Sequence, residues 1–275
     1  MRRINVILSL TILGLALAIC PETRAEMAEL YGLAPNIGAE LPSLGFSTLR
    51  GTFPDPKCPA LKNEVGVTFP VGIDSPGLDK RLAEQAKAKF DELSSREAGS
   101  CPGPGETPSN PVTDVKVTFT ATSPSRNYLS ILDTVFESSP MAAHPSTTTS
   151  ATTYNLQTGQ PLKLSDLFAD PAKSMPKLWA QMAAGFCGNY GHETLPYLYG
   201  LPEDQGCASK DIPLPDALKG ADIPFSALGS AVLTTDGLQV ILDAGDAWSY
   251  ADGPAELVIP KDDLVKMGAK METWN

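Results

Sequence analysis

The residues best able to do chemistry form a group near the C-terminal end of the sequence. Four carboxylates cluster around two aromatic residues within 14 residues: Asp243, Asp246, Trp248, Tyr250, Asp252 and Glu256. Two carboxylates can serve as acid and base in glycoside hydrolysis. Acidic and aromatic side chains together also suit binding of a sugar or of a cationic protein. A solvated acidic loop whose tryptophan packs on the core has the same pattern.

Nucleophilic catalysis would require a serine or cysteine beside a base. The sequence has no Gly-x-Ser-x-Gly motif, and its two histidines are His144 and His192. His144 precedes Pro145, which fits a turn with a locally bonded ring, and ligand contact is the functional alternative. We expect a non-enzyme, with a cell-wall glycan-acting enzyme or accessory module using carboxylates near residues 243–256 as the alternative.

Composition excludes several classes of partner. The chain has 275 residues and a net charge of −11, so nucleic-acid binding, which normally needs a basic face, is not expected. Hydrophobic residues make up 42%, enough to bury a core. The chain has no Cys-x-x-Cys spacing and only two histidines, so neither a metal nor a cofactor is expected.

The N-terminal residues predict export. Arg2 and Arg3 precede an uncharged apolar run over residues 4–19, and Thr23-Arg24-Ala25 fits a cleavage site. We expect a signal peptide over residues 1–25, cleaved after Ala25, and a periplasmic or secreted protein without a membrane span. An uncleaved anchor and a lipoprotein box at residues 17–20 are the alternatives. Cleavage removes three basic residues and one acidic one, which makes the mature net charge −13.

Cysteine usage predicts disulfides. Cys20 leaves with the signal peptide and four cysteines remain, an even number in an oxidising compartment. Three pairings are possible, and we favour Cys58 with Cys101 and Cys187 with Cys207 because each pair brackets a local unit.

Hydrophobic spacing predicts the elements that position these residues. A helix opened by Ser75 and Pro76 carries an apolar stripe at three- and four-residue spacing, and a second helix covers residues 172–186. Strands are expected over residues 47–53, 64–71, 115–121, 128–137, 146–154, 223–228, 230–234, 238–243 and 256–259. The expected organisation is an extended segment (26–60), a strand-helix-hairpin unit (61–125), a C-terminal domain (126–265) and a tail (266–275).

Several short segments, taken in chain order, are similar to motifs of one known family. They are Tyr128–Leu132, Ala142–Pro145, Tyr154–Leu156, Thr158–Gly159, Leu162–Phe168, Asp236–Leu238, Tyr250, Gly253 and Ile259–Pro260. This ordered set resembles the RsiV-type extracellular domain, a family long catalogued as a domain of unknown function. The family usually has Gly-Ala where this chain has Ala142-Ala143, so the turn before His144 departs from the pattern.

The resemblance implies an α+β fold of two packed subdomains, with an antiparallel sheet that carries helices on one face. Its relatives include anti-sigma-factor ectodomains that bind lysozyme, secreted mycobacterial immunogenic proteins, and domains beside polysaccharide deacetylases. Because three residues precede the apolar run, we expect a free-standing ectodomain.

The expected function is therefore that of a secreted or periplasmic non-enzymatic binding protein. Its ligand is expected to be lysozyme, another cationic protein or peptidoglycan fragments. The residues expected to contact the ligand are His144, Pro145, Trp248, Tyr250 and Asp252.

Overall fold

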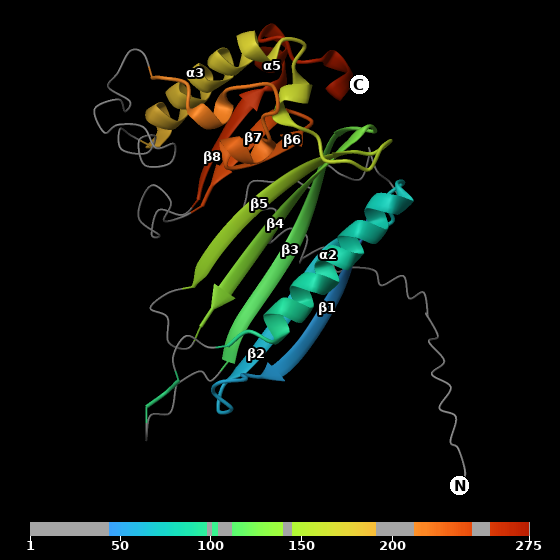
Figure 1. Cartoon of the computed structure of the whole chain (residues 1–275), viewed down its shortest axis with the longest axis vertical. Coiled ribbons are helices and arrows are strands. Elements are labelled where there is room, and N and C mark those ends of the chain that lie inside the picture. Colours follow the sequence, from blue (N-terminus) through green and yellow to red (C-terminus); the bar gives the residue numbers. More distant parts are fainter. Residues whose placement is uncertain are drawn as a thin grey trace. The chain divides into compact units, whose positions relative to one another are not determined.

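The computed structural model describes residues 44–97, 101–103, 112–139, 145–190, 212–243 and 254–274. Its elements form a five-stranded sheet, a three-stranded sheet and a few helices, so the expected α+β class is confirmed (Figure 1). The five-stranded sheet contains β1 (Gly45–Pro54), β2 (Lys62–Val71), β3 (Val112–Ser125), β4 (Tyr128–Ser138) and β5 (Ser146–Asn155). The three-stranded sheet contains β6 (Ser230–Thr234), β7 (Gly237–Leu242) and β8 (Ala255–Pro260).

The helices are α2 (Pro76–Ser94), α3 (Pro171–Tyr190) and α5 (Lys261–Lys266). Short 3-10 turns are η1 (Leu164–Leu167), η3 (Asp216–Leu218), η4 (Phe225–Leu228) and η6 (Met271–Trp274). Ser75 and Pro76 stand at the start of α2 as predicted, because the fixed φ of proline suits a first helical position.

The larger sheet follows the order β1-β2-β3-β4-β5. Neighbouring strands are antiparallel except β2 and β3, which are parallel. The sheet is therefore mixed rather than wholly antiparallel, because α2 connects β2 to β3 and returns the chain to the same end of the sheet. The predicted boundary between residues 125 and 126 falls at the turn between β3 and β4, which pair in this sheet.

The core of the larger sheet lies between its strands and α2. Alternate side chains of β2 and β3, such as Val67 and Val117, are buried with Leu78, Leu82 and other members of the predicted helix stripe. Burying one such side chain stabilises the fold by roughly 1.5–3 kcal/mol. The helix packs on β2 and β1 and leaves the adjoining face of β4 and β5 without a helix over it (Figure 1).

A second core lies between α3 and the smaller sheet. The buried face of α3 carries Met175, Leu178, Trp179, Met182 and Phe186, the three- and four-residue stripe of an amphipathic helix. These side chains share a cluster with alternate residues of β6, β7 and β8.

The strand predicted over residues 223–228 is wrong, since this segment contains η4. Pro224 has no N–H to donate to a strand ladder, and the Gly229 N–H bonds the Ser226 carbonyl at 3.1 Å. Gly229 then leaves the turn at a φ of 87°, a left-handed value that suits glycine.

Candidate functional site

A carboxylate–hydroxyl junction joins the two sheets. The Thr149 backbone N–H donates to Asp243 Oδ2 at 2.7 Å, and Thr149 Oγ1 donates to Asp243 Oδ1 at 2.7 Å. Thr149 Oγ1 also lies 2.9 Å from Ser230 Oγ at the start of β6. Since β5 forms one edge of its sheet, Asp243 occupies a backbone donor that would otherwise be open to another strand.

Further buried hydroxyls continue this contact between the sheets. Ser130 Oγ accepts from the Leu233 N–H at 2.9 Å and lies 2.8 Å from Thr153 Oγ1. Thr122 Oγ1 donates to the Leu233 carbonyl at 2.8 Å. A buried hydroxyl without a partner would cost stability, so these bonds fix how β6 lies on β3, β4 and β5.

The two residues of the junction are close in sequence to the predicted ligand residues. Asp243 directly precedes residues 244–253, and Thr149 is four residues beyond Pro145. Pro145 is exposed at the start of β5. The other residues predicted to contact the ligand lie outside the described residues: His144, Trp248, Tyr250 and Asp252.

The carboxylates predicted to act together make different contacts in the structure. Asp243 is held by Thr149, whereas Glu256 lies on β8, where Gln239 Nε2 donates to its Oε2 at 3.0 Å. Burial raises the pKa of the Glu256 carboxyl, and the Gln239 bond acts in the opposite direction. Tyr190 Oη bonds both the N–H and the C=O of Glu256, at 3.0 and 3.1 Å, and so ties the end of α3 to β8. Asp246 lies outside the described residues.

The first predicted disulfide is confirmed. Cys58 and Cys101 are bonded, with their Cα atoms 5.6 Å apart. Cys187 is also disulfide-bonded. Cys207 lies outside the described residues, so the Cys187–Cys207 pairing stays a prediction.

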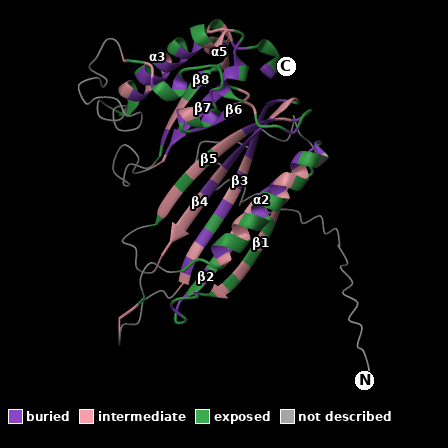
Figure 2. Ribbon diagram, viewed as in Figure 1, coloured by how far each residue is buried: buried purple, intermediate pink, exposed green. Residues whose placement is uncertain are grey.

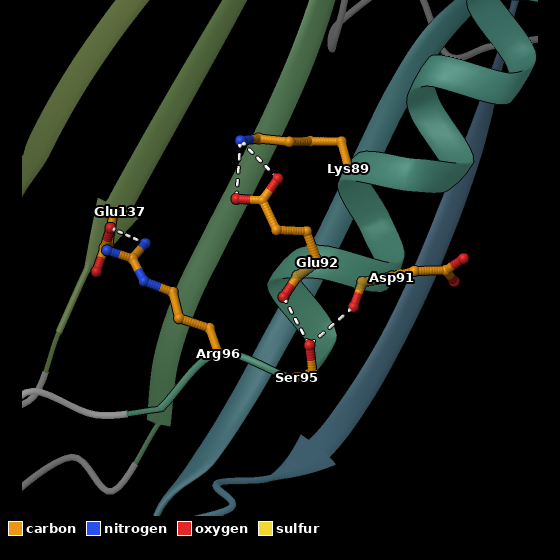
Figure 3. Close-up of polar contacts among 6 residues, drawn as sticks. All are labelled: Lys89, Asp91, Glu92, Ser95, Arg96 and Glu137. Carbon is orange, nitrogen blue, oxygen red and sulfur yellow. Dashed lines mark hydrogen bonds and ion pairs between the residues drawn. The ribbon is translucent and has the colours of Figure 1, made fainter.

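A charged group at the end of α2 links this helix to β4. Arg96 Nη1 donates to Glu137 Oε2 at 2.5 Å, and Lys89 Nζ bonds both Glu92 oxygens at 3.3 and 3.4 Å (Figure 3). The Ser95 hydroxyl donates to the Asp91 and Glu92 carbonyls at 3.2 and 3.0 Å, which closes the helix C-terminus.

Asp133 lies beneath this group and was not singled out by sequence reasoning. It occupies the same face of β4 as Leu129, Ile131 and Val135, which belong to or pack on the α2 core. Burial raises the pKa of Asp133 to about 6, although the Lys89 ammonium lowers it. Its Oδ1 is buried and has no hydrogen-bond partner. The sequence pattern that could have revealed Asp133 is a carboxylate that alternates with apolar residues on the buried face of a strand.

Within the six described ranges, no three His, Cys, Asp or Glu side chains are grouped to hold a metal ion. No helix in this part of the chain is long and apolar enough to cross a membrane.

Comparison with known proteins bears on the fold. No protein-family model and no curated protein sequence matches the chain. Two crystal structures do match: a member of the DUF3298 family from Bacteroides fragilis NCTC 9343 and a DUF3298 family protein from Pseudomonas aeruginosa PAO1. For each, the TM-score is 0.50, the identity is 16%, and the alignment covers 84% of this chain and 96% of that chain. The chain shares the DUF3298 fold.

The likeness to the DUF3298 structures covers most of each chain. It agrees with the expectation of a domain of unknown function, although the names of these proteins do not identify the RsiV type. At 16% identity, the DUF3298 fold carries no ligand or activity to this chain.

Proposed function

We propose that this protein is an exported, non-enzymatic binding protein whose ligand is lysozyme or a similarly cationic protein of the cell wall. The observation that carries the proposal is the bond between Thr149 and Asp243. It joins two residues that are 94 positions apart in sequence. The predicted ligand residues His144 and Pro145 shortly precede Thr149 in sequence, and Trp248, Tyr250 and Asp252 follow Asp243.

Charge supports a cationic ligand. The chain has a net charge of −11, and loss of the predicted signal peptide would make it −13. Opposite net charges accelerate the encounter of two proteins and make their association sensitive to salt. Trp248 and Tyr250 would then supply the aromatic anchors that commonly dominate binding energy at interfaces.

The contacts of Asp243 favour binding over hydrolysis. Both of its oxygens accept hydrogen bonds from Thr149, which would hold the carboxylate as a structural acceptor. A general base must instead reach the proton that it abstracts from the substrate or from water. Asp243 is therefore a poor partner for Glu256 in an acid–base pair.

Export is part of the same proposal. Its support is the Cys58–Cys101 disulfide, a bond typical of oxidising compartments, together with the signal-peptide pattern of residues 1–25. N-terminal sequencing of protein recovered from a periplasmic extract tests this part. A mature chain beginning at Glu26 is expected, and an uncleaved cytoplasmic chain would contradict it.

A titration tests the ligand. Calorimetry of the mature protein against a c-type lysozyme, at low and high salt, should show binding that weakens at least tenfold at high salt. A parallel bacteriolytic assay would tell whether binding inhibits the enzyme. Absence of heat at both salt concentrations, with lysozyme activity unchanged, would refute a lysozyme ligand.

A further inference from the structure

A row of threonines crosses the larger sheet on the face opposite α2. Strand register aligns one residue from each of the five strands: Thr48, Thr68, Thr118, Thr134 and Thr149. Their neighbours along each strand, such as Val67 and Val117, belong to the α2 core, so the threonines point to the other face. Neighbouring members of the row are about 4.8 Å apart, the spacing of paired strands.

The hydroxyls of this row are not equivalent. Thr48 Oγ1 and Thr68 Oγ1 bond each other at 3.0 Å on the exposed side of the sheet. At the other end, Asp243 and Ser230 already bond Thr149. The accessible part of the row therefore lies over β1, β2 and β3.

The adjoining row contains a gap between two cations. The same registers align Arg50, Gly66, Lys116 and Phe136. A Cβ added to Gly66 would meet no described atom within 4 Å. Glycine weakens a strand interior and often marks a place where a ligand approaches the backbone closely.

This face is open to solvent at the gap. Arg50 and Thr48 are exposed, and alternate residues of β1 are exposed along the strand (Figure 2). The Lys116 side chain is 64% exposed. Its Nζ lies 5.9 Å from the centroid of the Phe136 ring, which is only partly buried.

The charges on this face nearly cancel. Its cations are Arg50, Lys62 and Lys116, and its carboxylates are Glu64 and Asp114, which are aligned with each other two residues before Gly66 and Lys116. Lys116 Nζ bonds Asp114 Oδ2 at 2.7 Å. A small net charge of mixed sign disfavours a strongly cationic or anionic ligand, whereas hydroxyls that both donate and accept suit a ligand rich in hydroxyls.

We propose that this face binds an uncharged linear glycan. We name as the threonine platform the residues Thr48, Thr68, Thr118, Gly66, Arg50, Lys116 and Phe136. The glycan lies across the strands over the Gly66 gap, with its hydroxyl and amide groups bonded to the threonine row and the two cations. The C–H face of a sugar ring rests on Phe136. This site is separate from the proposed lysozyme contact and does not depend on it.

Binding to a defined oligosaccharide tests the platform. The probe is the soluble hexamer of β-1,4-linked N-acetylglucosamine, titrated into the mature protein. The triple variant Thr48→Val/Thr68→Val/Thr118→Val keeps the branched side chains and removes the three hydroxyls. It should bind the hexamer at least tenfold more weakly than the wild type while keeping its melting temperature within a few degrees.

A matched variant controls for general effects of hydroxyl loss. Thr148→Val/Ser150→Ala/Thr152→Val alters three hydroxyls on the opposite face of β5 and should bind as the wild type does. Gly66→Val fills the gap with a residue that strands accept, and should also weaken binding.

Three results would overturn the proposal. They are no binding of the hexamer by the wild type, equal binding by the platform and control variants, and binding of polygalacturonate in place of the hexamer. The last result would assign an anionic ligand. A lysozyme titration on the same protein samples tests the proposed protein ligand independently, so failure of the glycan proposal can be told from failure of the lysozyme proposal.

Discussion

At the scale of single residues, Asp133 makes stability depend on pH. Its pKa is about 6 in the fold, against 3.8 for an unperturbed Asp, so the folded state prefers the neutral carboxyl. The associated stability is fully present below about pH 4 and is lost as pH rises through about 6. Asp133→Asn removes this loss and should raise the free energy of unfolding at pH 8 by up to about 3 kcal/mol.

Urea denaturation at pH 4 and pH 8 checks this prediction. The variant and the wild type should be nearly equal at pH 4, where Asp133 is neutral. A stability difference of the same size at both pH values would show that the carboxyl is not titrating in the expected range.

The Asp243 carboxylate stabilises the fold, because it accepts hydrogen bonds from the N–H and the hydroxyl of Thr149. Asp243→Ala leaves the Thr149 N–H and hydroxyl without this acceptor and should destabilise the protein by about 1–3 kcal/mol. Asp222→Ala is the matched control, because Asp222 is exposed and its ion pair with Lys163 is screened by solvent, so its loss should hardly change the melting temperature. Thermal unfolding of both variants measures the contrast, and equal melting temperatures would argue against a structural junction.

At the scale of elements, the Cys58–Cys101 bond closes a loop of 43 residues that contains β2 and α2. Replacing both cysteines with serine restores the chain entropy of the unfolded state and should cost about 3–4 kcal/mol. Guanidinium denaturation of the double variant without reductant leaves the bond of Cys187 intact and checks the value. An unchanged midpoint would mean that this disulfide does not stabilise the element.

The β6–β7 turn depends on one glycine. Gly237 has a φ of 149°, and a Cβ there would lie 2.1 Å from the Ile259 carbonyl oxygen. Gly237→Ala should therefore cost about 2–4 kcal/mol, because the backbone of β8 must move. A Cβ added to Gly188 in α3 meets no atom of the described residues within 4 Å, so Gly188→Ala should instead add about 0.5–1 kcal/mol. A thermal melt of each variant distinguishes the two, and similar melting temperatures would contradict the turn geometry.

At the scale of the whole molecule, local patterns predicted the elements well. Alternation in residues 115–121 and the stripe containing Leu78 and Leu82 depend on neighbours in sequence, and both elements are present. The Cys58–Cys101 pair was also predicted correctly, because the two cysteines bracket a local unit, which favoured this pairing among the three possible ones.

These local patterns do not predict which strands pair or which distant residues form hydrogen bonds. The parallel register of β2 and β3 depends on how α2 returns the chain, and the Thr149–Asp243 bond joins residues 94 positions apart. The threonine row likewise exists only through four strand registers, which join residues from β1 to β5. The strand predicted over residues 223–228 is wrong for a local reason, because Pro224 has no N–H and stands directly before η4.

We propose that the residues close in sequence to the Thr149–Asp243 junction bind a cationic protein. The most direct test compares three proteins in the lysozyme titration: wild type, Trp248→Ala/Tyr250→Ala, and the platform variant Thr48→Val/Thr68→Val/Thr118→Val as control. The aromatic double variant should lose binding while keeping its melting temperature, and the control should bind as the wild type does. Undiminished binding by the aromatic double variant would refute this protein contact.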